Sequence, residues 1–286
     1  MSAELLRTIP EIRSRLAEVR RSGCTVGFVP TMGALHAAHG ALIRRAWEES
    51  DFVVVSVFVN PTQFDRGEDF DRYPRTLPAD VEFCAALDVD IVFAPDAKEM
   101  YAEPHLTLVE VSSLSERLCG EFRPGHFRGV ATVVAKLLNI VQPDRAYFGE
   151  KDAQQLAIVR KMVTDLNVPV TIVPVATVRE PDGLAMSSRN RRLDAGERRI
   201  AATLYRALQA AARRVASGAT SPEEVRSAAL AVLGSEDAIR VEYLEIVNPE
   251  RMQPVERIDG PVRIAAAVWI GATRLIDNVL CQPERG

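Results

Sequence analysis

The sequence predicts an α/β fold, in which a Rossmann-like, doubly wound parallel sheet is followed by a smaller C-terminal α+β domain. Two observations predict this class. Short apolar runs rich in β-branched residues alternate with helical patterns over residues 1–179, as in the strand–helix–strand units of a parallel sheet. From residue 180 the chain turns polar and basic, and two helical patterns and two strand patterns follow. We therefore expect a Rossmann-like domain over residues 1–179 and a smaller lid domain over residues 180–286.

The composition narrows the class of protein. A chain of 286 residues with 47% hydrophobic and 26% charged residues is ordinary for a soluble globular protein. The net charge of −4 and the pI near 5.7 argue against a nucleic-acid partner, because such surfaces normally carry a basic surplus. The four cysteines have no C-x-x-C spacing and are typical of reduced thiols. No signal-peptide pattern and no bilayer-length apolar run is present, so we expect a cytoplasmic protein without a membrane partner.

The first strand–loop–helix unit carries a histidine pair. After a helix over Pro10–Arg21, the apolar run Val26–Val29 predicts a buried strand, and Pro30–Leu35 predicts a tight loop before the next helix. His36 and His39 stand three residues apart where this loop becomes the helix, so both rings can face the unpaired N–H groups of the helix start. Such a place attracts phosphate. Half of a zinc site and two solvated histidines are the alternatives.

Amide side chains follow the next strand. The run Asp51–Val59 is apolar and β-branched, as expected of a parallel strand covered on both faces. Asn60 and Gln63 leave its carboxyl end, where they could bind a small polar substrate or serve as ordinary turn residues. Residues 65–80 are polar and turn-rich, which predicts a mobile loop over a site.

A third unit ends in a glycine-rich turn. A helix is expected over 78–87 and a strand over 90–93. Arg123 and His126 lie in the turn GEFRPGHFRG, just before an apolar helix over 130–141. They could form an anion pocket with the N–H groups of the helix, or a solvated helix entry with a buried histidine.

The following strand, Asp144–Phe148, leads through Gly149–Asp152 into a helix over 153–166. Lys151 could contact a phosphate, or it could be an ordinary surface lysine. Gln154 and Gln155 lie on the first helical turn and could reach the same site. Two further strands are expected, over 170–173 and 176–179.

The polar loop over 180–192 opens the second domain. Its Ser187, Ser188 and Arg189 could bind triphosphate oxygens, or they could be linker residues. Helices are expected over 194–217 and 221–233, the second opening with a serine cap and a proline, and strands over 239–247 and 262–270.

Six segments in order resemble one family: PTMGALHAAH, FVNPTQF, YPRT, RPGHFRGVATVVAKL, YFGEKDAQQL and VREPDGLAMSSRNRRL. Through residues 26–193 the chain resembles the pantothenate synthetases, the pantoate–β-alanine ligases of the nucleotidyltransferase-like α/β superfamily. The resemblance implies an enzyme that uses ATP and Mg²⁺ to join pantoate to β-alanine through pantoyl adenylate, releasing AMP and pyrophosphate. It also implies a homodimer.

The resemblance further implies site residues. The catalytic residues would be His39, His36, Lys151 and Arg189. The ATP site would comprise Met32, Gly33, Ala34, Leu35, His36, Ala37, Ala38, His39, Gly149, Glu150, Lys151, Asp152, Val178, Met186, Ser187, Ser188 and Arg189. Gln63 and Gln155 would hold pantoate, with Asn60, Tyr73, Arg123 and His126 as further substrate neighbours, and Asp80 would lie near magnesium.

One position departs from the family pattern. The family usually has H-x-G-H, whereas this chain has Ala37 and Ala38 between its two histidines. The methyl group of Ala38 would push the nucleotide outward, so we expect weaker ATP binding. A related nucleotidyltransferase or truncated aminoacyl-tRNA synthetase and a non-catalytic nucleotide sensor are the rival functions. Residues 194–286 are neither strongly basic nor long enough to favour the synthetase, and glutamines at two strand ends favour a second small ligand over a sensor.

Overall fold

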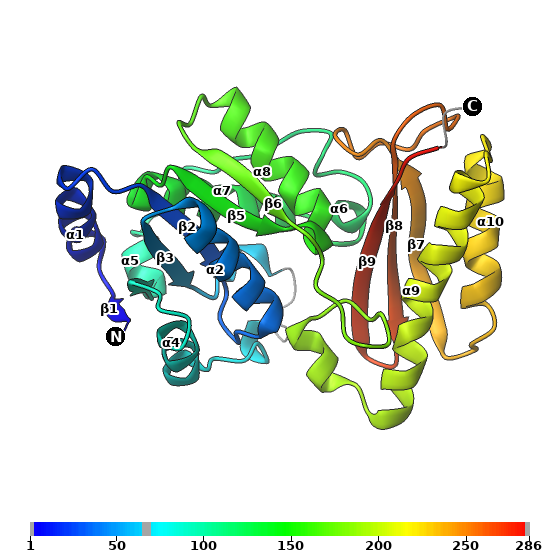
Figure 1. The fold of residues 1–286 in the computed structure, drawn as a ribbon, viewed down its shortest axis with the longest axis horizontal. Coiled ribbons are helices and arrows are strands. Elements are labelled where there is room, and N and C mark those ends of the chain that lie inside the picture. The colour runs from blue at the N-terminus through cyan, green and yellow to red at the C-terminus, as the bar shows by residue number, and fades with distance from the viewer. Residues whose placement is uncertain (1–2, 65–69, 284–286) are drawn as a thin grey trace. The chain divides into compact units, whose positions relative to one another are not determined.

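The computed structural model describes residues 3–64 and 70–283, and it divides into two compact units (Figure 1). The first unit comprises residues 1–115, 123–150 and 158–176. The second comprises residues 116–122, 151–157 and 177–286. Of the loop predicted over 65–80, residues 65–69 lie outside the described part of the chain, and the last residues begin a helix.

The first unit is built on a six-stranded parallel sheet with the order β1-β4-β3-β2-β5-β6. Its strands are β1 (Glu4–Leu6), β2 (Val26–Thr31), β3 (Phe52–Val57), β4 (Ile91–Phe93), β5 (Arg145–Gly149) and β6 (Thr171–Val175). The chain winds from β2 outward to β4 and then crosses back to β5 on the other side of β2. This reversal makes the sheet doubly wound, which confirms the predicted fold class. In such sheets ligands bind outside the carboxyl ends of the strands, where the order reverses.

Helices flank the sheet (Figure 1). They are α1 (Ile9–Arg21), α2 (Ala37–Glu49), α4 (Leu77–Ala85), α5 (Ala97–Met100), α7 (His126–Val141) and α8 (Ala153–Asp165), with the short 3-10 helices η1 (Pro61–Gln63) and η2 (Glu150–Asp152). The first five residues of α8 count with the second unit. Val53, Val54 and Val55 of β3 are fully buried in succession, because helices cover both faces of a central parallel strand.

The second unit contains a three-stranded antiparallel sheet with the order β7-β8-β9. Its strands are β7 (Ile239–Val247), β8 (Val262–Ile270) and β9 (Thr273–Cys281), and its helices are α6 (Cys119–Phe122), α9 (Ala195–Ala216), α10 (Pro222–Leu233) and the 3-10 helix η3 (Ser188–Arg192). Asp194 caps α9 by accepting hydrogen bonds from the backbone N–H groups of Gly196 and Glu197. Buried residues such as Leu204, Leu208 and Ile264 join α9 to the sheet. The α+β character predicted for this part is confirmed.

Two strands were not predicted, and one prediction was wrong. The N-terminal strand β1 was missed because three residues show too little alternation. Strand β9 was missed as well. The strand predicted over 176–179 is not formed; instead β6 extends to Val175, and the following residues fold back so that Arg179 makes an isolated bridge with Ala185. Within the described residues, no helix combines the length and the apolar character needed to cross a membrane.

Candidate active site

The histidine loop joins β2 to α2 in the first unit. Gly33 and Ala34 both have left-handed backbones, with φ of 81° and 52°, and these tighten the turn. A Cβ on Gly33 would lie 2.9 Å from a carboxylate oxygen of Asp80, so glycine is required both for its backbone and for this close approach. Thr31 accepts a hydrogen bond from the Gly33 N–H through its hydroxyl at 3.1 Å. The left-handed backbone and the Thr31 hydroxyl thus both help to fix the shape of the loop.

Asp80 supports this loop from the first turn of α4. Its side chain is 2% exposed, and its carboxylate accepts hydrogen bonds from the backbone N–H of Ala34 at 3.1 Å and of Leu35 at 2.8 Å. The hydroxyl of Thr76 donates to the same carboxylate at 3.1 Å. Among the residues that the structure describes, no group of three or more His, Cys, Asp or Glu side chains is arranged to hold a metal ion. The magnesium role of Asp80 stays a prediction, and its observed contacts are with the loop.

The rings of the two histidines lie close together, tilted by 47°, at the start of α2. Their ring centroids lie 4.2 Å apart, and the backbone N–H of His36 donates to Nδ1 of His39 at 3.2 Å. Because Nδ1 of His39 accepts this bond, the proton of its neutral ring resides on Nε2. His39 therefore offers an N–H donor next to the N–H groups of the first helical turn, an arrangement that favours a bound phosphate.

Asn60 and Gln63 form a buried amide pair after β3. The Nδ2 of Asn60 donates to Oε1 of Gln63 and to the carbonyl of Gly129, both at 3.1 Å. The Nε2 of Gln63 lies 2.9 Å from the sulfur of Met32 in the histidine loop. The structure thus brings Gln63, one of the two residues predicted to hold pantoate, into contact with the loop predicted to bind ATP.

Arg123 and His126 converge on the main chain of Gln63. Nδ1 of His126 donates to the Gln63 carbonyl at 2.7 Å, and the Arg123 guanidinium donates to the same carbonyl at 3.3 Å. Nε2 of His126 lies 3.3 Å from the Arg123 guanidinium and accepts from it in this tautomer. The two residues hold Gln63 in place, and their predicted contact with an anion stays a prediction.

Close packing fixes the amide pair further. A Cβ on Gly129 of α7 would lie 2.2 Å from the carbonyl oxygen of Thr62, so only glycine allows α7 to approach η1 this closely. The Tyr101 hydroxyl, which the sequence did not single out, donates to Oδ1 of Asn60 at 2.6 Å. Burial raises the pKa of this hydroxyl, which keeps its proton in place for the donation. Tyr73 is buried, and its ring lies edge-on to Phe64.

The remaining predicted residues follow β5 or lie in the second unit. Gly149 ends β5, and Glu150, Lys151 and Asp152 form η2. Gln155 of α8 is half-buried, whereas Gln154 is used structurally, because it accepts from the Cys119 N–H and donates to the Arg117 carbonyl.

The serine-rich segment of the second unit is ordered by hydrogen bonds of its own. The N–H of Met186 donates to the Val178 carbonyl at 2.9 Å. The hydroxyl of Ser187 caps η3 by accepting from the Arg189 N–H at 3.2 Å. Ser188 and Arg189 are half-exposed, and their predicted phosphate contacts stay predictions.

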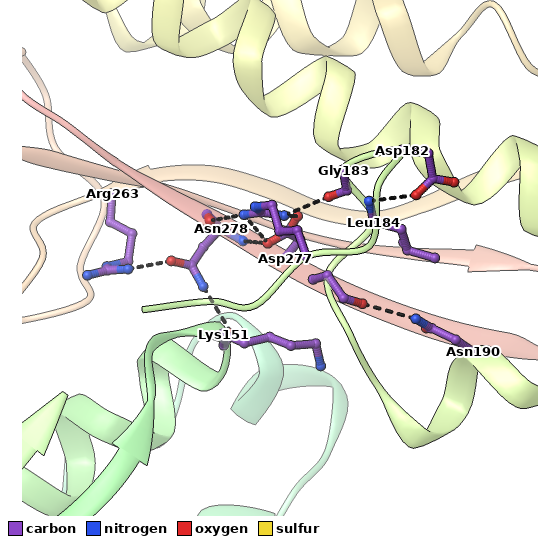
Figure 2. Close-up of polar contacts among 10 residues, drawn as sticks. Lys151, Asp182, Gly183, Leu184, Asn190, Arg263, Asp277 and Asn278 are labelled. Atoms are coloured by element: carbon purple, nitrogen blue, oxygen red, sulfur yellow. Dashed lines mark hydrogen bonds and ion pairs between the residues drawn. The ribbon is translucent and has the colours of Figure 1, made fainter. Parts of the chain in front are cut away.

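Two polar residues of β9 hold these segments, and the sequence reasoning missed both. Figure 2 shows that Asn278 is hydrogen-bonded to Lys151. Asp277 accepts hydrogen bonds from Arg179, which also donates to the Gly183 carbonyl. The signal that could have found them is a pair of polar residues interrupting an apolar strand pattern.

Comparison with known proteins identifies relatives along nearly the whole chain. The family model described as pantoate-beta-alanine ligase matches residues 4–280. The pantothenate synthetase of Moorella thermoacetica is 50% identical over 279 residues, covering 98% of this chain and 99% of that protein. The bifunctional pantoate ligase/cytidylate kinase of Synechococcus sp. strain JA-2-3B'a(2-13) is 52% identical, with 98% of this chain but 52% of that protein covered. The chain therefore spans about half the length of this bifunctional relative.

Solved structures agree with these sequence relatives. The pantothenate synthetase from Thermus thermophilus has a TM-score of 0.91 at 47% identity, covering 96% of this chain and 98% of that one. The pantoate-beta-alanine ligase from Francisella tularensis, solved in complex with beta-gamma ATP and beta-alanine, has a TM-score of 0.81 at 35% identity, covering 99% of both chains.

Proposed function

Because this chain belongs to the pantoate–β-alanine ligase family, we propose that it joins (R)-pantoate to β-alanine to give pantothenate, a precursor of coenzyme A. The pantoate carboxylate attacks the α-phosphorus of ATP and releases pyrophosphate, and the amine of β-alanine then attacks the carbonyl of pantoyl adenylate and releases AMP. The contact between Gln63 and Met32 supports this function most directly, because it joins a pantoate-binding candidate to the ATP-binding loop.

We propose that fixed donors carry the adenylation step. Charge builds up on the α-phosphate and on the departing pyrophosphate, so the enzyme needs preorganised cations and N–H groups and no covalent nucleophile. His39 supplies Nε2–H beside the start of α2, and Lys151 and Arg189 supply positive charge. His36 fixes the ring of His39 through its backbone N–H.

We propose that the remaining nucleotide contacts come from the three segments that carry His39, Lys151 and Arg189. The backbone of the histidine loop would line the phosphates, and the short segments after β5 and before η3 would complete the site. These residues are Met32, Gly33, Ala34, Leu35, Ala37, Ala38, Gly149, Glu150, Asp152, Val178, Met186, Ser187 and Ser188.

Pantoate binding is proposed at Gln63 and Gln155. The Nε2 of Gln63 faces a thioether sulfur, which is a weak acceptor, so a substrate oxygen would replace it favourably. Asn60 fixes the orientation of the Gln63 amide, and Arg123 and His126 fix its main chain. Neutral amides suit this ligand, since they bind its hydroxyl groups without neutralising the attacking carboxylate.

Magnesium is proposed to arrive with the nucleotide. Mg²⁺ usually keeps several waters and is held by one or two carboxylates together with substrate phosphates. Asp80 fits poorly as its main ligand, because its carboxylate already accepts three hydrogen bonds from the loop and from Thr76.

The decisive experiment measures pyrophosphate release from ATP and Mg²⁺, first with pantoate alone and then with β-alanine added. A stoichiometric burst with pantoate that becomes sustained turnover with β-alanine is the expected result. Measurable ATP binding without pyrophosphate release under either condition would instead identify a nucleotide sensor.

The alanine at position 38 should weaken ATP binding. Ala38 is the second residue of α2, in the first helical turn, whose N–H groups are proposed to meet the phosphates. Ala38→Gly should therefore lower the KM for ATP a few-fold, although glycine costs the helix up to about 1 kcal/mol.

Ala37→Gly is the matched control for this substitution. It introduces the same backbone freedom one residue earlier, at the first position of α2. An unchanged KM for ATP in Ala38→Gly, or an equal decrease in both variants, would contradict the role of the methyl group.

The location and assembly of the protein are also proposals. We propose a cytoplasmic homodimer that acts on small molecules, without nucleic-acid or membrane partners, on the basis of the family resemblance and the acidic composition.

A further inference from the structure

Strand β9 carries two adjacent polar residues that are almost completely buried. Asp277 is 3% exposed and Asn278 is 6% exposed, opposite Ala266 and Ala265 of β8. β9 is the edge strand of its sheet, so its second edge is open to contacts with other segments. Buried polar groups are costly unless they are hydrogen-bonded, and each of these two holds a different segment of the second unit.

Asp277 holds the turn around Gly183 through Arg179. The Arg179 guanidinium donates to both carboxylate oxygens of Asp277, at 2.6 and 3.0 Å, and to the Gly183 carbonyl at 3.1 Å. The same guanidinium lies 3.8 Å from the ring centroid of Tyr205 in α9. Gly183 has a φ of 92°, and a Cβ there would lie 2.3 Å from the Tyr205 ring. The turn is therefore held against α9 and β9.

This turn positions the segment Ser187–Arg189, which follows it in the chain. Arg179 pairs with Ala185 in an antiparallel bridge (Figure 2 shows the surrounding contacts). The Nδ2 of Asn190 donates to the Ala185 carbonyl and to the Glu180 carboxylate, both at 3.1 Å. Through Asn190, the segment that carries Arg189 is thus hydrogen-bonded to residues before and after Gly183, in the turn that Asp277 holds through Arg179.

Asn278 holds the second segment directly. Its Nδ2 donates to the carbonyl of Lys151 at 2.9 Å, and its Oδ1 accepts from the guanidinium of Arg263. Lys151 lies close enough for its positive charge to act on Asp277: burial raises the pKa of Asp277, while Arg179 and, more weakly, Lys151 lower it. Neighbouring residues of one strand thus hold the two segments that carry the proposed phosphate donors.

We propose that Asp277 and Asn278 are positioning residues for adenylation, acting as one rigid anchor that sets Lys151 and Arg189 at a fixed separation. This inference rests on the phosphate-binding roles proposed for Lys151 and Arg189. Neither anchor residue is proposed to touch a substrate. Because catalysis depends on donors placed where charge develops, a displacement of about 1 Å costs on the order of 100-fold in rate.

The first experiment compares three single variants, with pyrophosphate formation from ATP and pantoate as the readout. Asp277→Asn and Asn278→Ala should each lower kcat about 10- to 100-fold. Glu242→Gln is the matched control: Glu242 and Arg274 form a similarly buried pair in the same sheet, with side-chain exposures of 8% and 15%, against 1% for Asp277 and 19% for Arg179. The control should lower the melting temperature as much as Asp277→Asn while retaining activity within a few-fold.

Double variants separate positioning from general destabilisation. In an Arg189→Ala background, Asp277→Asn should cause less than about a threefold further loss, because the group that it positions is already gone. Asn278→Ala should show the same non-additivity with Lys151→Ala. Fully additive losses, or losses in Asp277→Asn no larger than in Glu242→Gln, would overturn the proposal.

Arg179→Lys provides a second route if Asp277→Asn does not fold. Lysine keeps the positive charge beside Asp277 but cannot make the bidentate contact with both carboxylate oxygens, so kcat should again fall at least about tenfold. Wild-type activity in Arg179→Lys would overturn the anchor. If Arg189→Ala and Lys151→Ala themselves leave the rate unchanged, the proposed phosphate contacts fail instead, so the two failures are distinguishable.

Discussion

Replacing His39 with asparagine should lower the rate of pyrophosphate formation about 100-fold with little change in stability, since removing one preorganised donor typically costs this much. The Oδ1 of asparagine can take the place of Nδ1 as acceptor for the His36 N–H, which keeps the contact observed at 3.2 Å. The donor at the Nε2 position is lost. Steady-state kinetics and thermal unfolding of the same preparation measure the two effects.

His39→Gln is the reciprocal variant. Glutamine reaches the Nε2 position with an N–H donor but does not supply the acceptor for His36, so it should retain more activity than asparagine and lose more stability. Equal activities in the two variants would show that the donor at Nε2 does not contribute to catalysis.

Gly129→Ala should destabilise the protein by about 1–3 kcal/mol and raise the KM for pantoate, because overpacked contacts of this kind force the backbone to move. The new methyl group would lie 2.2 Å from the Thr62 carbonyl oxygen and 2.7 Å from the Gln63 Cα, so η1 must shift away from α7. Urea unfolding gives the free-energy change, and the dependence of turnover on pantoate concentration gives the KM.

Gly40→Ala is a suitable control for this substitution. Gly40 is also buried in a helix, but the atoms nearest to its added Cβ belong to side chains at 3.3 Å or more. The unfolding free energy of Gly40→Ala should change little, because mild crowding by these side chains opposes the helix preference of alanine over glycine, which is up to about 1 kcal/mol. An unchanged pantoate KM in Gly129→Ala would show that the position of η1 is unimportant for substrate binding.

The sequence could predict the parallel sheet because its signal is local. The consecutive buried valines of β3 and the alternation with helices leave few other architectures. The strand β9 was harder, since Asp277 and Asn278 interrupt its apolar pattern for reasons that lie in Arg179 and Lys151, which are 98 and 127 residues away along the chain. The lid role of residues 180–286 stays a prediction.

The sequence could predict which residues belong to the candidate site better than it could predict the contacts between them. The histidine pair and the Asn60–Gln63 pair are each close in sequence, so their proximity follows from local geometry. The convergence of Arg123 and His126 on the Gln63 carbonyl depends on how α7 packs against η1, which no local pattern encodes. Tyr101 gave no sequence signal either, because its contact with Asn60 also depends on packing between segments that are distant in sequence.

The left-handed turn at Gly33 and Ala34 also bears on the thermodynamics of ligand binding. The turn and its bonds to Asp80 determine the shape of the loop during folding, so the proposed nucleotide would meet a loop that is already ordered. The conformational entropy of ordering the loop is therefore lost when the chain folds, and little more is lost when the ligand binds. If the loop binds nucleotide as proposed, folding stability and nucleotide affinity depend on the same few contacts, and a change that loosens this turn should weaken both together.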